Sequence, residues 1–321
     1  MMMKPKIRAG LEEAADVIRS ATSIVTTGHI GPDGDSLGSA LGLALTARDY
    51  GIEAVAAFGG SFVMPEHLLF LDASPVVEPG DVAAPDVLVT FDVGDLDRIG
   101  EVAAVAAKAK TVVMIDHHLS TTGFGDIKVN DPSAGAAAQL CYRLIEILGW
   151  DLKPAAAMAL HVGMVTDTGR FQYSNTTPEV LDVASKLVAA GARPEVIGQA
   201  VYESVPFGYL GVAGAVMLRA LIEGPLVWSY VTQQDLAAHG IGMEETDPLI
   251  DSVRLARESD VAALLKEQPD GGWKVSLRSR GRVDVAAIAV ANGGGGHHNA
   301  AGFSFAGTVN QAIDEVRTRL T

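Results

Sequence analysis

From about residue 11 to residue 115 the sequence alternates between short hydrophobic runs and longer helical patterns. The short runs are rich in β-branched residues and have the length of strands; they span 23–27 (SIVTT), 53–58, 87–91 (VLVTF) and 111–115 (TVVMI). The longer stretches, at 11–19 and 36–50, have the apolar spacing of helices. Near-continuous hydrophobic strands separated by helices are typical of a parallel sheet covered on both faces. We therefore predict an α/β fold for this part of the chain.

The pattern changes around residues 191–194. Predicted helices at 134–148, 155–165 and 179–190 precede this point, and a mostly helical stretch follows it to about residue 221. Strand-like runs then appear at 226–231, 261–266 and 273–277, with closing helices at 283–291 and 309–320. This mixture predicts a smaller α+β domain. We expect an α/β domain over 1–190, a helical connector over 191–222 and a second, smaller domain over 223–321.

The composition limits the kinds of partner. The chain of 321 residues carries a formal net charge of −15. This balance disfavours long duplex nucleic acid, because affinity for it comes largely from Lys and Arg neutralising phosphates. A short, multiply charged ligand in a local cationic pocket remains compatible with it. The single cysteine, Cys141, excludes an intrachain disulfide, fits a reducing cytosol and is expected to be a small buried hydrophobic residue.

The sequence has no obvious membrane segment. No uninterrupted apolar stretch reaches the roughly 18–20 residues that a spanning helix needs. The basic segment 1–8 lacks the apolar core of a signal peptide. We predict a cytoplasmic protein without a membrane partner.

Polar side chains gather where the predicted strands end, which is where open parallel sheets bind ligands. The strand ends and one helix end contribute His29, Asp33, Asp35, Asp92, Asp116, His117, His118 and Asp167. Each acid alone has an ordinary explanation as a helix cap or turn residue, and Asp35 could cap the helix that follows it. His161, inside an apolar helix, is expected to be structural rather than a ligand. Four polar clusters in one half of the chain favour a shared site.

The residue types suggest the ions. Carboxylates and imidazoles without thiolate suit Mn²⁺ or Mg²⁺ and accept Zn²⁺ or Co²⁺. The four aspartates Asp33, Asp35, Asp92 and Asp167 carry a charge of −4, which two divalent cations would offset. Two cations about 3.5–4 Å apart can activate a water and hold a phosphoryl group for in-line attack. The sequence therefore predicts a two-metal phosphoesterase.

A glycine-rich motif near the C-terminus predicts a second polar site. The segment 292–302 reads NGGGGHHNAAG. We expect the glycines to open a small-residue helix whose backbone N–H groups can approach an anion; the ordinary alternative is a flexible surface loop. Arg278, at the end of the predicted strand 273–277, offers a cation for a phosphate or a nucleobase.

These motifs carry a family resemblance. GHIGPDGDSLGS (28–39), FDVGDLDR (91–98), IDHH (115–118) and VTDTGRF (165–171) resemble the four motifs of the DHH phosphoesterase family. SLRS (276–279) followed by GGGGHHNAAG (293–302) resembles the DHHA1 domain that accompanies it. The resemblance covers nearly the whole chain, with the motifs in the same order.

The resemblance implies a role for each residue. One ion would be held by His29, Asp33 and Asp92, and the other by Asp35, Asp92, His117 and Asp167, with Asp92 bridging. His118 would contact the scissile phosphate while Asp116 orients a neighbouring histidine. The substrate's terminal phosphate or nucleotide would be bound by Arg278, Ser279, Gly294, Gly295, Gly296 and His297.

The chain is similar in size to stand-alone DHH–DHHA1 enzymes that act on very short nucleotides. The implied activity is hydrolysis of short oligoribonucleotides and linear dinucleotides such as pApA to 5′-mononucleotides, of 3′-phosphoadenosine 5′-phosphate (pAp) to AMP, or of both. Two divalent ions are expected, Mn²⁺ first, with Mg²⁺ or Co²⁺ as alternatives. A polyphosphate or pyrophosphate hydrolase and a non-catalytic nucleotide sensor remain alternatives. A homodimer is left open.

Overall fold

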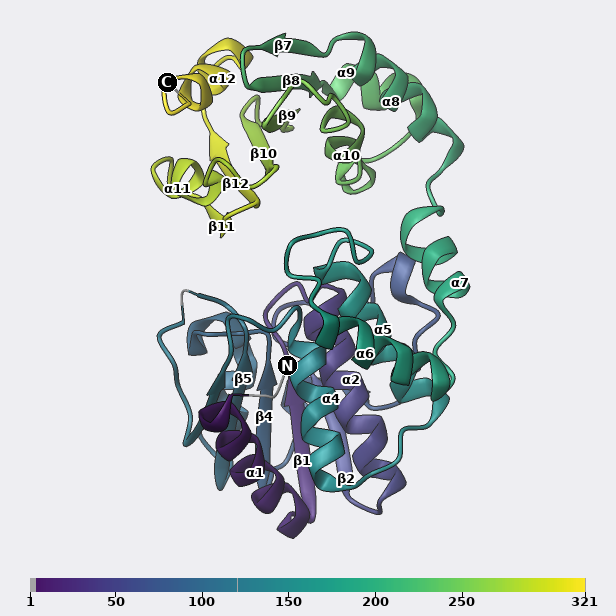
Figure 1. Ribbon diagram of the computed structural model, residues 1–321. Helices are drawn as coiled ribbons and strands as arrows, with labels where there is room; N and C mark the ends of the chain where they lie inside the picture. Colours follow the sequence, from purple (N-terminus) through teal and green to yellow (C-terminus); the bar gives the residue numbers. More distant parts are fainter. Residues whose placement is uncertain (1–3, 120, 321) are drawn as a thin grey trace. The chain divides into compact units, whose positions relative to one another are not determined.

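The computed structural model of the chain describes residues 4–119 and 121–320, which fall into two units, Met1–Ser204 and Val205–Thr321 (Figure 1). The α/β character predicted for the first part and the mixed α+β character predicted for the second are both confirmed. The boundaries 190 and 222, and the separate connector between them, stay predictions.

The first unit is built on a six-stranded sheet in the order β3-β2-β1-β4-β5-β6, and every neighbouring pair is parallel. The strands are β1 (Ser23–Thr27), β2 (Glu53–Ala57), β3 (Val76–Val77), β4 (Val87–Phe91), β5 (Thr111–Asp116) and β6 (Ile127–Asn130). The two edge strands β3 and β6 escaped the sequence analysis because they are too short to show a strand pattern. The four predicted strands form the centre of the sheet, so their carboxyl ends meet along one edge.

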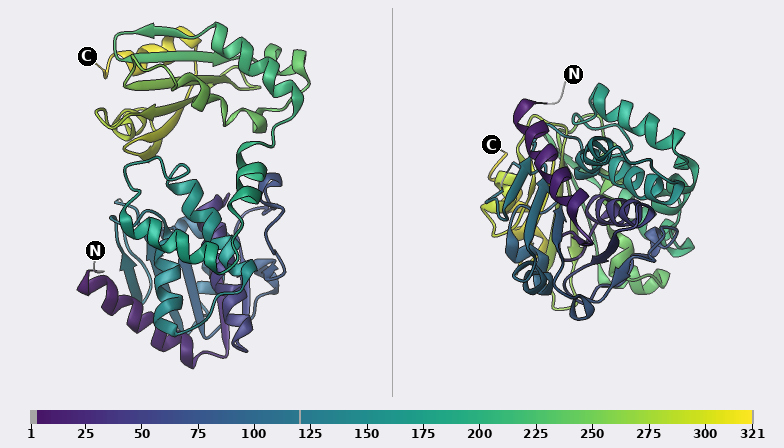
Figure 2. Two further views of the ribbon diagram at one scale, coloured as in Figure 1. Left: turned by 45° about the vertical axis from the view of Figure 1, so that its right-hand side comes forward. Right: turned by 90° about the horizontal axis from the view of Figure 1, so that it is seen from below.

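Helices cover both faces of this sheet (Figures 1 and 2). The helical elements are α1 (Pro5–Ser20), α2 (Gly34–Asp49), η1 (Glu66–Leu68), η2 (Pro79–Asp81), η3 (Leu96–Val102), α3 (Ala103–Ala106), α4 (Ala137–Leu148), α5 (Pro154–Asp167), α6 (Pro178–Ala189), α7 (Pro194–Ile197) and the π-helical η4 (Gly198–Tyr202). α1, α2, α4 and α5 form the larger core on one face, and η3 with α3 forms a smaller core on the other. Covered on both faces, the strands are hydrophobic throughout.

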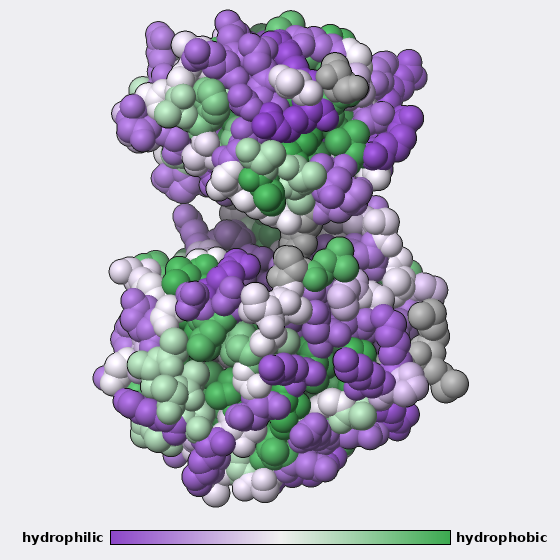
Figure 3. Space-filling view, turned by 90° about the vertical axis from the view of Figure 1, so that its left-hand side faces the viewer, coloured by the Kyte–Doolittle hydropathy of each residue, from purple (hydrophilic) through white to green (hydrophobic). Residues whose placement is uncertain are grey.

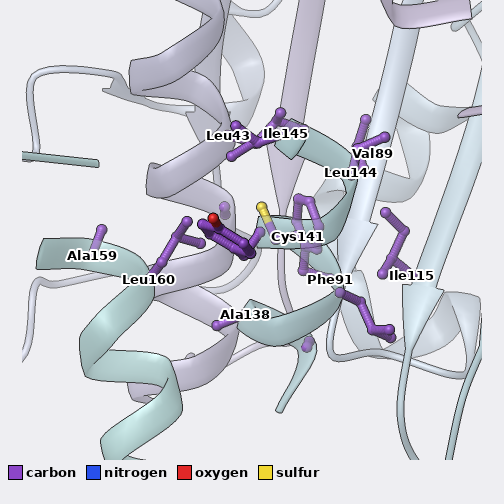
Figure 4. Packing of buried hydrophobic residues seen from close by; sticks show 14 of the residues in the cluster. Leu43, Val89, Phe91, Ile115, Ala138, Cys141, Leu144, Ile145, Ala159 and Leu160 are labelled. Carbon is purple, nitrogen blue, oxygen red and sulfur yellow. The ribbon is translucent and has the colours of Figure 1, made fainter. Parts of the chain in front are cut away.

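Cys141 lies inside the larger core, as expected for a small hydrophobic residue. Its side chain is fully buried among residues of α2, α4, α5 and the central strands (Figure 4). The Sγ atom donates a hydrogen bond to the Ser39 carbonyl at 3.6 Å. Burial raises the pKa of this thiol well above its usual range, so the cysteine is a packing residue rather than a reactive one.

Glycines bring α2 and α5 into direct backbone contact. A Cβ on Gly38 would lie 2.2 Å from the carbonyl oxygen of Ala159, and one on Gly42 would lie 2.6 Å from the Leu160 side chain. At the site end of the helix pair, a Cβ on Gly34 would meet the Thr166 side chain at 2.6 Å. Only glycine permits this approach. The start of α2 is thereby placed beside the end of α5, although more than a hundred residues separate them in sequence.

The second unit contains a six-stranded mixed sheet in the order β11-β12-β10-β9-β8-β7. The strands are β7 (Leu221–Glu223), β8 (Leu226–Val231), β9 (Val261–Glu267), β10 (Trp273–Ser279), β11 (Gly295–His297) and β12 (Ala300–Phe305). The helical elements are α8 (Phe207–Leu218), α9 (Gln233–His239), η5 (Met243–Thr246), α10 (Leu249–Val253), α11 (Val285–Val290) and α12 (Val309–Arg317). α11 and α12 pack on one face of the sheet, and α8, α9 and α10 pack on the other.

The prediction that the glycine run opens a small-residue helix is wrong. Residues 295–297 and 300–305 are two antiparallel strands, β11 and β12. The glycines are needed because the two strands lie very close: a Cβ on Gly294 would be 2.1 Å from the Gly302 oxygen, and one on Gly296 would be 2.5 Å from the Ala300 oxygen. Gly296 also has a φ of 140°. The small residues therefore permit close packing of two strands, and they do not begin a helix.

Among the described residues, no single helix is long and apolar enough to cross a membrane. One bent pair, Pro194–Tyr202 with Phe207–Leu218, meets the criteria of length and composition only when the two pieces are taken together. On the face shown in Figure 3, hydrophilic residues dominate the surface of both units and hydrophobic residues form scattered patches.

Candidate metal centre

Asp33 begins the helix α2 and anchors the first site segment. Its Oδ1 accepts hydrogen bonds from the backbone N–H groups of Asp35 and Ser36 at 3.1 and 3.0 Å, and the Ser36 hydroxyl accepts from the Asp33 N–H at 3.1 Å. This is a reciprocal helix cap. The cap is therefore Asp33 and not Asp35, which removes capping as the explanation for Asp35. The remaining Asp33 oxygen, Oδ2, takes no part in the cap.

Asp35 is fully buried and held by the start of another helix. Its Oδ2 accepts a hydrogen bond of 2.6 Å from the N–H of Ala137, and its Oδ1 accepts one of 2.8 Å from the N–H of Ala138. The Ser39 hydroxyl donates a further bond of 3.3 Å. The N–H groups of Ala137 and Ala138 lie at the N-terminus of α4, where the helix dipole favours an anion. The carboxylate is thus fixed before any cation binds.

Asp92 follows β4 in a strained conformation. Its φ is 59°, in the left-handed region that only a few per cent of non-glycine residues occupy, with asparagine, aspartate and histidine the most frequent among them. Its N–H donates to the carbonyl of Ile115 on the neighbouring strand β5 at 3.0 Å, which holds the strained backbone in place. Strain of this kind is concentrated at functional sites and is maintained by the surrounding fold. It turns the Asp92 carboxylate to the edge where β1, β4 and β5 end.

Asp92 lies between two groups of ligand atoms. On one side, His29 Nε2 is 3.7 Å from Asp92 Oδ2 and 3.7 Å from Asp33 Oδ1. On the other side, His117 Nε2 is 3.3 Å from Asp92 Oδ1. Each oxygen of Asp92 therefore faces a different histidine.

The second group is centred on His117. Its Nε2 lies 3.0 Å from Asp167 Oδ2 and 3.8 Å from Asp35 Oδ2. The ligand atoms of His29, Asp33 and Asp92 lie within 4.8 Å of one another, as do those of Asp35, His117 and Asp167. The fold thus brings all six predicted metal ligands together in overlapping groups, and a third group, formed by Asp92, His117 and His118, meets the same distance limit. Their role as ligands stays a prediction.

The histidine ring nitrogens are arranged as metal sites require. His29 Nδ1 lies 3.0 Å from the Ile30 carbonyl oxygen, and His117 Nδ1 lies 3.2 Å from the Ala134 carbonyl oxygen. A carbonyl only accepts, so Nδ1 donates in both rings. When each ring is neutral, the lone pair is on Nε2 and points into the acid cluster. Metal-binding histidines are oriented by this kind of outer hydrogen bond.

Buried polar atoms at the centre lack hydrogen-bond partners. Asp92 Oδ1 and His117 Nε2 are both inaccessible to solvent and make no hydrogen bond among the described residues. Such atoms are costly unless something compensates them. The donor set of oxygen and imidazole nitrogen fits a divalent cation of the Mn²⁺ or Mg²⁺ type.

Burial and neighbouring charges shift the pKa values of the clustered acids and histidines. Burial raises the pKa of Asp167 to about 6; the His117 contact opposes this shift, and the charge of Asp92 adds to it. Burial also holds the pKa of Asp35 well above its usual range, helped by Asp167 and Asp92. Burial disfavours the charged form of His29, but its contacts with Asp33 and Asp92 outweigh this and raise its pKa to about 10. The site therefore attracts positive charge strongly.

His118 and Asp116 form a separate pair next to the cluster. His118 Nδ1 lies 2.7 Å from Asp116 Oδ1, and the same oxygen accepts hydrogen bonds from the backbone N–H groups of His117 and His118. Burial disfavours protonation of His118, but Asp116 and then Asp92 raise the pKa of the ring. His118 Nδ1 is 3.4 Å from Asp92 Oδ1, so this imidazole lies at the edge of the cluster of acids and histidines.

Sequence reasoning missed a residue that joins the two halves of the second ligand group. The Asn175 side-chain amide donates to the Asp167 carbonyl at 3.1 Å and to the Gly135 carbonyl at 3.0 Å. Gly135 lies just before α4, whose N–H groups bind Asp35. One amide therefore ties the chain at Asp167 to the loop that fixes Asp35. A single asparagine in a loop gives no sequence signal for this role.

The predicted substrate-binding residues of the second unit do not all lie on the same face of the sheet. Arg278 lies on β10, and Gly295 and Gly296 lie on β11. Ser279 is buried and its hydroxyl accepts a hydrogen bond from the Gly281 N–H at 3.0 Å, so it points to the opposite face of β10 from Arg278. The side chain of His297 lies outside the described residues. These substrate-binding assignments stay predictions.

Comparison with known proteins identifies the family of the chain. The model for the DHH family, N-terminal domain, matches residues 23–164, and the model for the DHHA1 domain matches residues 224–321. The bifunctional oligoribonuclease and PAP phosphatase NrnA of Thermus thermophilus is 31% identical over 328 residues, which cover 99% of this chain and 97% of that protein. The protein of the same name from Bacillus subtilis is 27% identical, covering 88% and 89% of the two chains.

A solved structure extends the likeness to the whole fold. The crystal structure of an exopolyphosphatase-related protein from Bacteroides fragilis superimposes with a TM-score of 0.90 at 25% identity, covering 98% of this chain and 96% of that one. With both domain models matched and a relative of this identity spanning nearly the full length, the chain belongs to the DHH–DHHA1 family of phosphoesterases that includes the NrnA proteins.

Proposed function

We propose that this enzyme uses two divalent cations to hydrolyse short oligoribonucleotides, pAp, or both. The observation that carries the proposal is the pair of ligand groups on either side of Asp92, in which Asp92 Oδ1 and His117 Nε2 lie 3.3 Å apart and make no hydrogen bond among the described residues. The full-length similarity to proteins named as bifunctional oligoribonuclease and PAP phosphatase supports the substrate class.

In this proposal each ion has its own ligand group. His29, Asp33 and Asp92 hold one ion, while Asp35, His117 and Asp167 hold the other together with the second Asp92 oxygen. Bound there, the two ions would activate a water and neutralise charge on the phosphoryl group. Mn²⁺ is the ion we expect first, and Mg²⁺ or Co²⁺ would satisfy the same donor types.

The protein's own groups would orient the phosphate. The contact of His118 Nδ1 with Asp116 Oδ1 orients the ring, and we expect the imidazole to donate a hydrogen bond to a phosphate oxygen. Its raised pKa favours the protonated form, which strengthens that bond. Asp116 acts through His118, because its Oδ1 is already occupied by two backbone N–H groups and the imidazole. As the family resemblance implies, Arg278 would bind a phosphate of the substrate.

A second candidate is hydrolysis of polyphosphate or pyrophosphate. The Bacteroides fragilis protein with the same overall fold is described as exopolyphosphatase-related, which favours this alternative over others. The same metal ligands would serve both reactions. The two candidates differ in whether a nucleoside is recognised.

A substrate panel tests the proposal. The purified enzyme is assayed with Mn²⁺ against pAp, pApA, a three-residue RNA, a three-residue DNA, pyrophosphate and short polyphosphate. We expect turnover of pAp and the ribonucleotides, abolished in Asp92→Asn, in which asparagine keeps the left-handed backbone accessible. Cleavage of pyrophosphate or polyphosphate alone would replace the proposal by the second candidate. Absence of turnover on every substrate, with the metals bound, would favour a nucleotide sensor.

A further inference from the structure

One face of the sheet in the second unit is covered by helices over only part of its width. Along β10, side chains alternate between the two faces. Trp273, Val275 and Leu277 are buried in the core formed with α11 and α12. Lys274, Ser276 and Arg278 lie on the opposite face, where Lys274 is exposed and the other two are partly exposed.

The register shows what surrounds these three residues. On β9, the partners of Ser276 and Arg278 are Leu264 and Ala262, which belong to the core under α8 and α10. On the other side, the β12 partners of Lys274, Ser276 and Arg278 are Ser304, Gly302 and Ala300. The helices therefore cover the β8–β9 half of this face. The β10–β12 half carries only small residues beside the two cations, so a ligand can approach the strands closely.

The charge on this face is positive and only partly compensated. The buried Lys266, opposite Lys274 on β9, forms an ion pair with Asp247. Among residues 4–119 and 121–320, Lys274 and Arg278 have no ion-pair partner; Arg278 Nη1 donates to the Leu277 carbonyl at 3.1 Å. Three cations and one acid give this face a charge of +2, although the chain as a whole carries −15.

The cations are close enough to influence one another. Burial lowers the pKa of Lys266, the Asp247 carboxylate opposes this, and the charges of Lys274 and Arg278 lower the pKa further. Lys266 itself cannot reach a ligand, because its side chain is only 2% exposed. Asp247 neutralises the buried Lys266. Lys274 and Arg278 therefore remain available on the open half of the face.

We propose that Lys274 binds a second phosphate of a phosphodiester chain that lies along β10, with Arg278 on the first phosphate and the Ser276 hydroxyl between them. Lys274 and Arg278 are four residues apart on one strand, which places their Cα atoms about 13 Å apart. A charge-assisted hydrogen bond to phosphate is only about 2.7–2.9 Å long. Two cations at this separation are suited to two phosphates.

This inference rests on the proposed function and adds a length preference to it. A bisphosphorylated mononucleotide such as pAp has no phosphodiester linkage, so it has no chain of phosphates to lie along β10. An oligonucleotide of three or four residues has further phosphates for Lys274. The contribution of Lys274 should therefore grow with the number of phosphodiester linkages.

The test compares Lys274→Gln and Lys274→Glu with the full-length wild-type enzyme. Arg257→Gln is the matched control, because Arg257 is 91% exposed in the same unit and pairs only with its neighbour Glu258 in the described structure. Values of kcat/KM are measured for pAp and for a four-residue RNA at several salt concentrations. Binding of the same four-residue RNA, carrying a fluorescent label, is measured in the presence of EDTA, so that a metal-dependent reaction cannot proceed.

For Lys274→Gln, we expect the ratio of kcat/KM for the four-residue RNA to that for pAp to fall about 5- to 10-fold through KM, as for loss of one charged contact. The logarithmic salt dependence of RNA binding should weaken by about 0.7, the value for one lost contact with a single strand. Lys274→Glu should strengthen both effects. Arg257→Gln should behave as wild type.

The outcomes separate this inference from the proposed function. An active enzyme whose substrate ratio and salt dependence are unchanged in Lys274→Gln and Lys274→Glu, with normal melting temperatures, overturns the second phosphate site. An enzyme without phosphoesterase activity, whose RNA binding in EDTA still depends on Lys274, overturns the proposed function but supports the site. Equal losses of RNA binding in Lys274→Gln and Arg257→Gln would indicate general electrostatic attraction and would also overturn the second phosphate site.

Discussion

Gly163 packs so tightly against Asp35 that a Cβ at position 163 would lie 2.6 Å from the Asp35 Oδ1 atom. The same Cβ would lie 2.8 Å from the Cβ of Ala138, whose N–H group holds that oxygen. Gly163 is in the middle of α5, where glycine weakens a helix. The position of a site carboxylate therefore depends on the absence of one methyl group on a neighbouring helix.

Gly163→Ala should destabilise the protein and weaken cation binding. The added methyl group overpacks a rigid contact, which typically costs about 1–3 kcal/mol. Displacing Asp35 should also lower Mn²⁺ affinity by about 10-fold or more, by analogy with the loss of an orienting contact. Urea unfolding and titration calorimetry measure the two effects.

Gly214→Ala is the matched control for that variant. Gly214 also lies inside a helix, α8, but a Cβ there would meet nothing within 4 Å. Gly214→Ala should stabilise the protein by about 0.5–1 kcal/mol, because alanine favours the helix more than glycine does, and it should leave Mn²⁺ binding unchanged. Equal behaviour of the two variants would show that the contact with Asp35 is unimportant.

Asn175→Ala should weaken one cation more than the other. Its amide holds the Asp167 carbonyl and the loop before α4, so its loss loosens Asp167 and Asp35 but not His29. Loss of such an outer contact costs about 10–100-fold in metal affinity. A two-site Mn²⁺ titration should show one weakened and one unchanged site.

Asn292→Ala controls for the loss of an amide-to-carbonyl hydrogen bond, since Asn292 donates to the Ile288 carbonyl at 3.0 Å in the second unit. It should leave both Mn²⁺ affinities as they are. If Asn175→Ala weakens both sites equally, Asn175 supports the fold in general and not the Asp35–Asp167 ligand group.

Cation binding should release protons and strengthen as pH rises. Without a cation, the contacts with Asp33 and Asp92 raise the His29 pKa to about 10 against the effect of burial, so the ring is protonated at pH 7. A cation takes the Nε2 lone pair only after that proton leaves. Calorimetry in buffers of low and high ionisation enthalpy should give different apparent enthalpies, and Mn²⁺ affinity should increase between pH 6 and pH 9. A pH-independent affinity would contradict this assignment of His29.

His161 should make the protein sensitive to acid. Both ring nitrogens are buried without a hydrogen-bond partner among the described residues, the residue is 2% exposed, and burial lowers its pKa to about 4 from the usual 6.5. The unfolded chain therefore takes up a proton before the folded protein does. The stability that depends on the neutral ring is complete above pH 6.5 and is lost as pH falls towards 4, by at most about 3 kcal/mol.

His161→Leu tests that prediction. Leucine has a similar size and no polar atoms, so the variant should be more stable at every pH, and its advantage should be larger at pH 5 than at pH 8. Unfolding free energies from urea titrations at both pH values measure the difference. An equal gain at both pH values would mean that His161 does not titrate in the unfolding reaction.

The central strands and the acidic residues after them could be predicted because their signals are local. A buried parallel strand such as 87–91 must be hydrophobic along its whole length, and a polar residue such as Asp92 directly after it marks the ligand-binding edge. The short edge strands left no pattern to detect. The glycine run gave a wrong prediction because small residues permit close packing in a strand pair as readily as at a helix start, and only the pairing of β11 with β12 distinguishes these cases.

The sequence by itself determined the fold class, the family and which acids and histidines the fold brings together, because hydrophobic period and strand-end chemistry are properties of neighbouring residues. Tertiary structure alone decided how those residues are held: Asp33 caps α2, Ala137 and Ala138 fix Asp35, and Asn175 joins the loops. Such contacts link segments as far as 103 residues apart, as for Asp35 and Ala138, so no local pattern encodes them. The open cationic face around Lys274 likewise depends on which half of the sheet the helices cover.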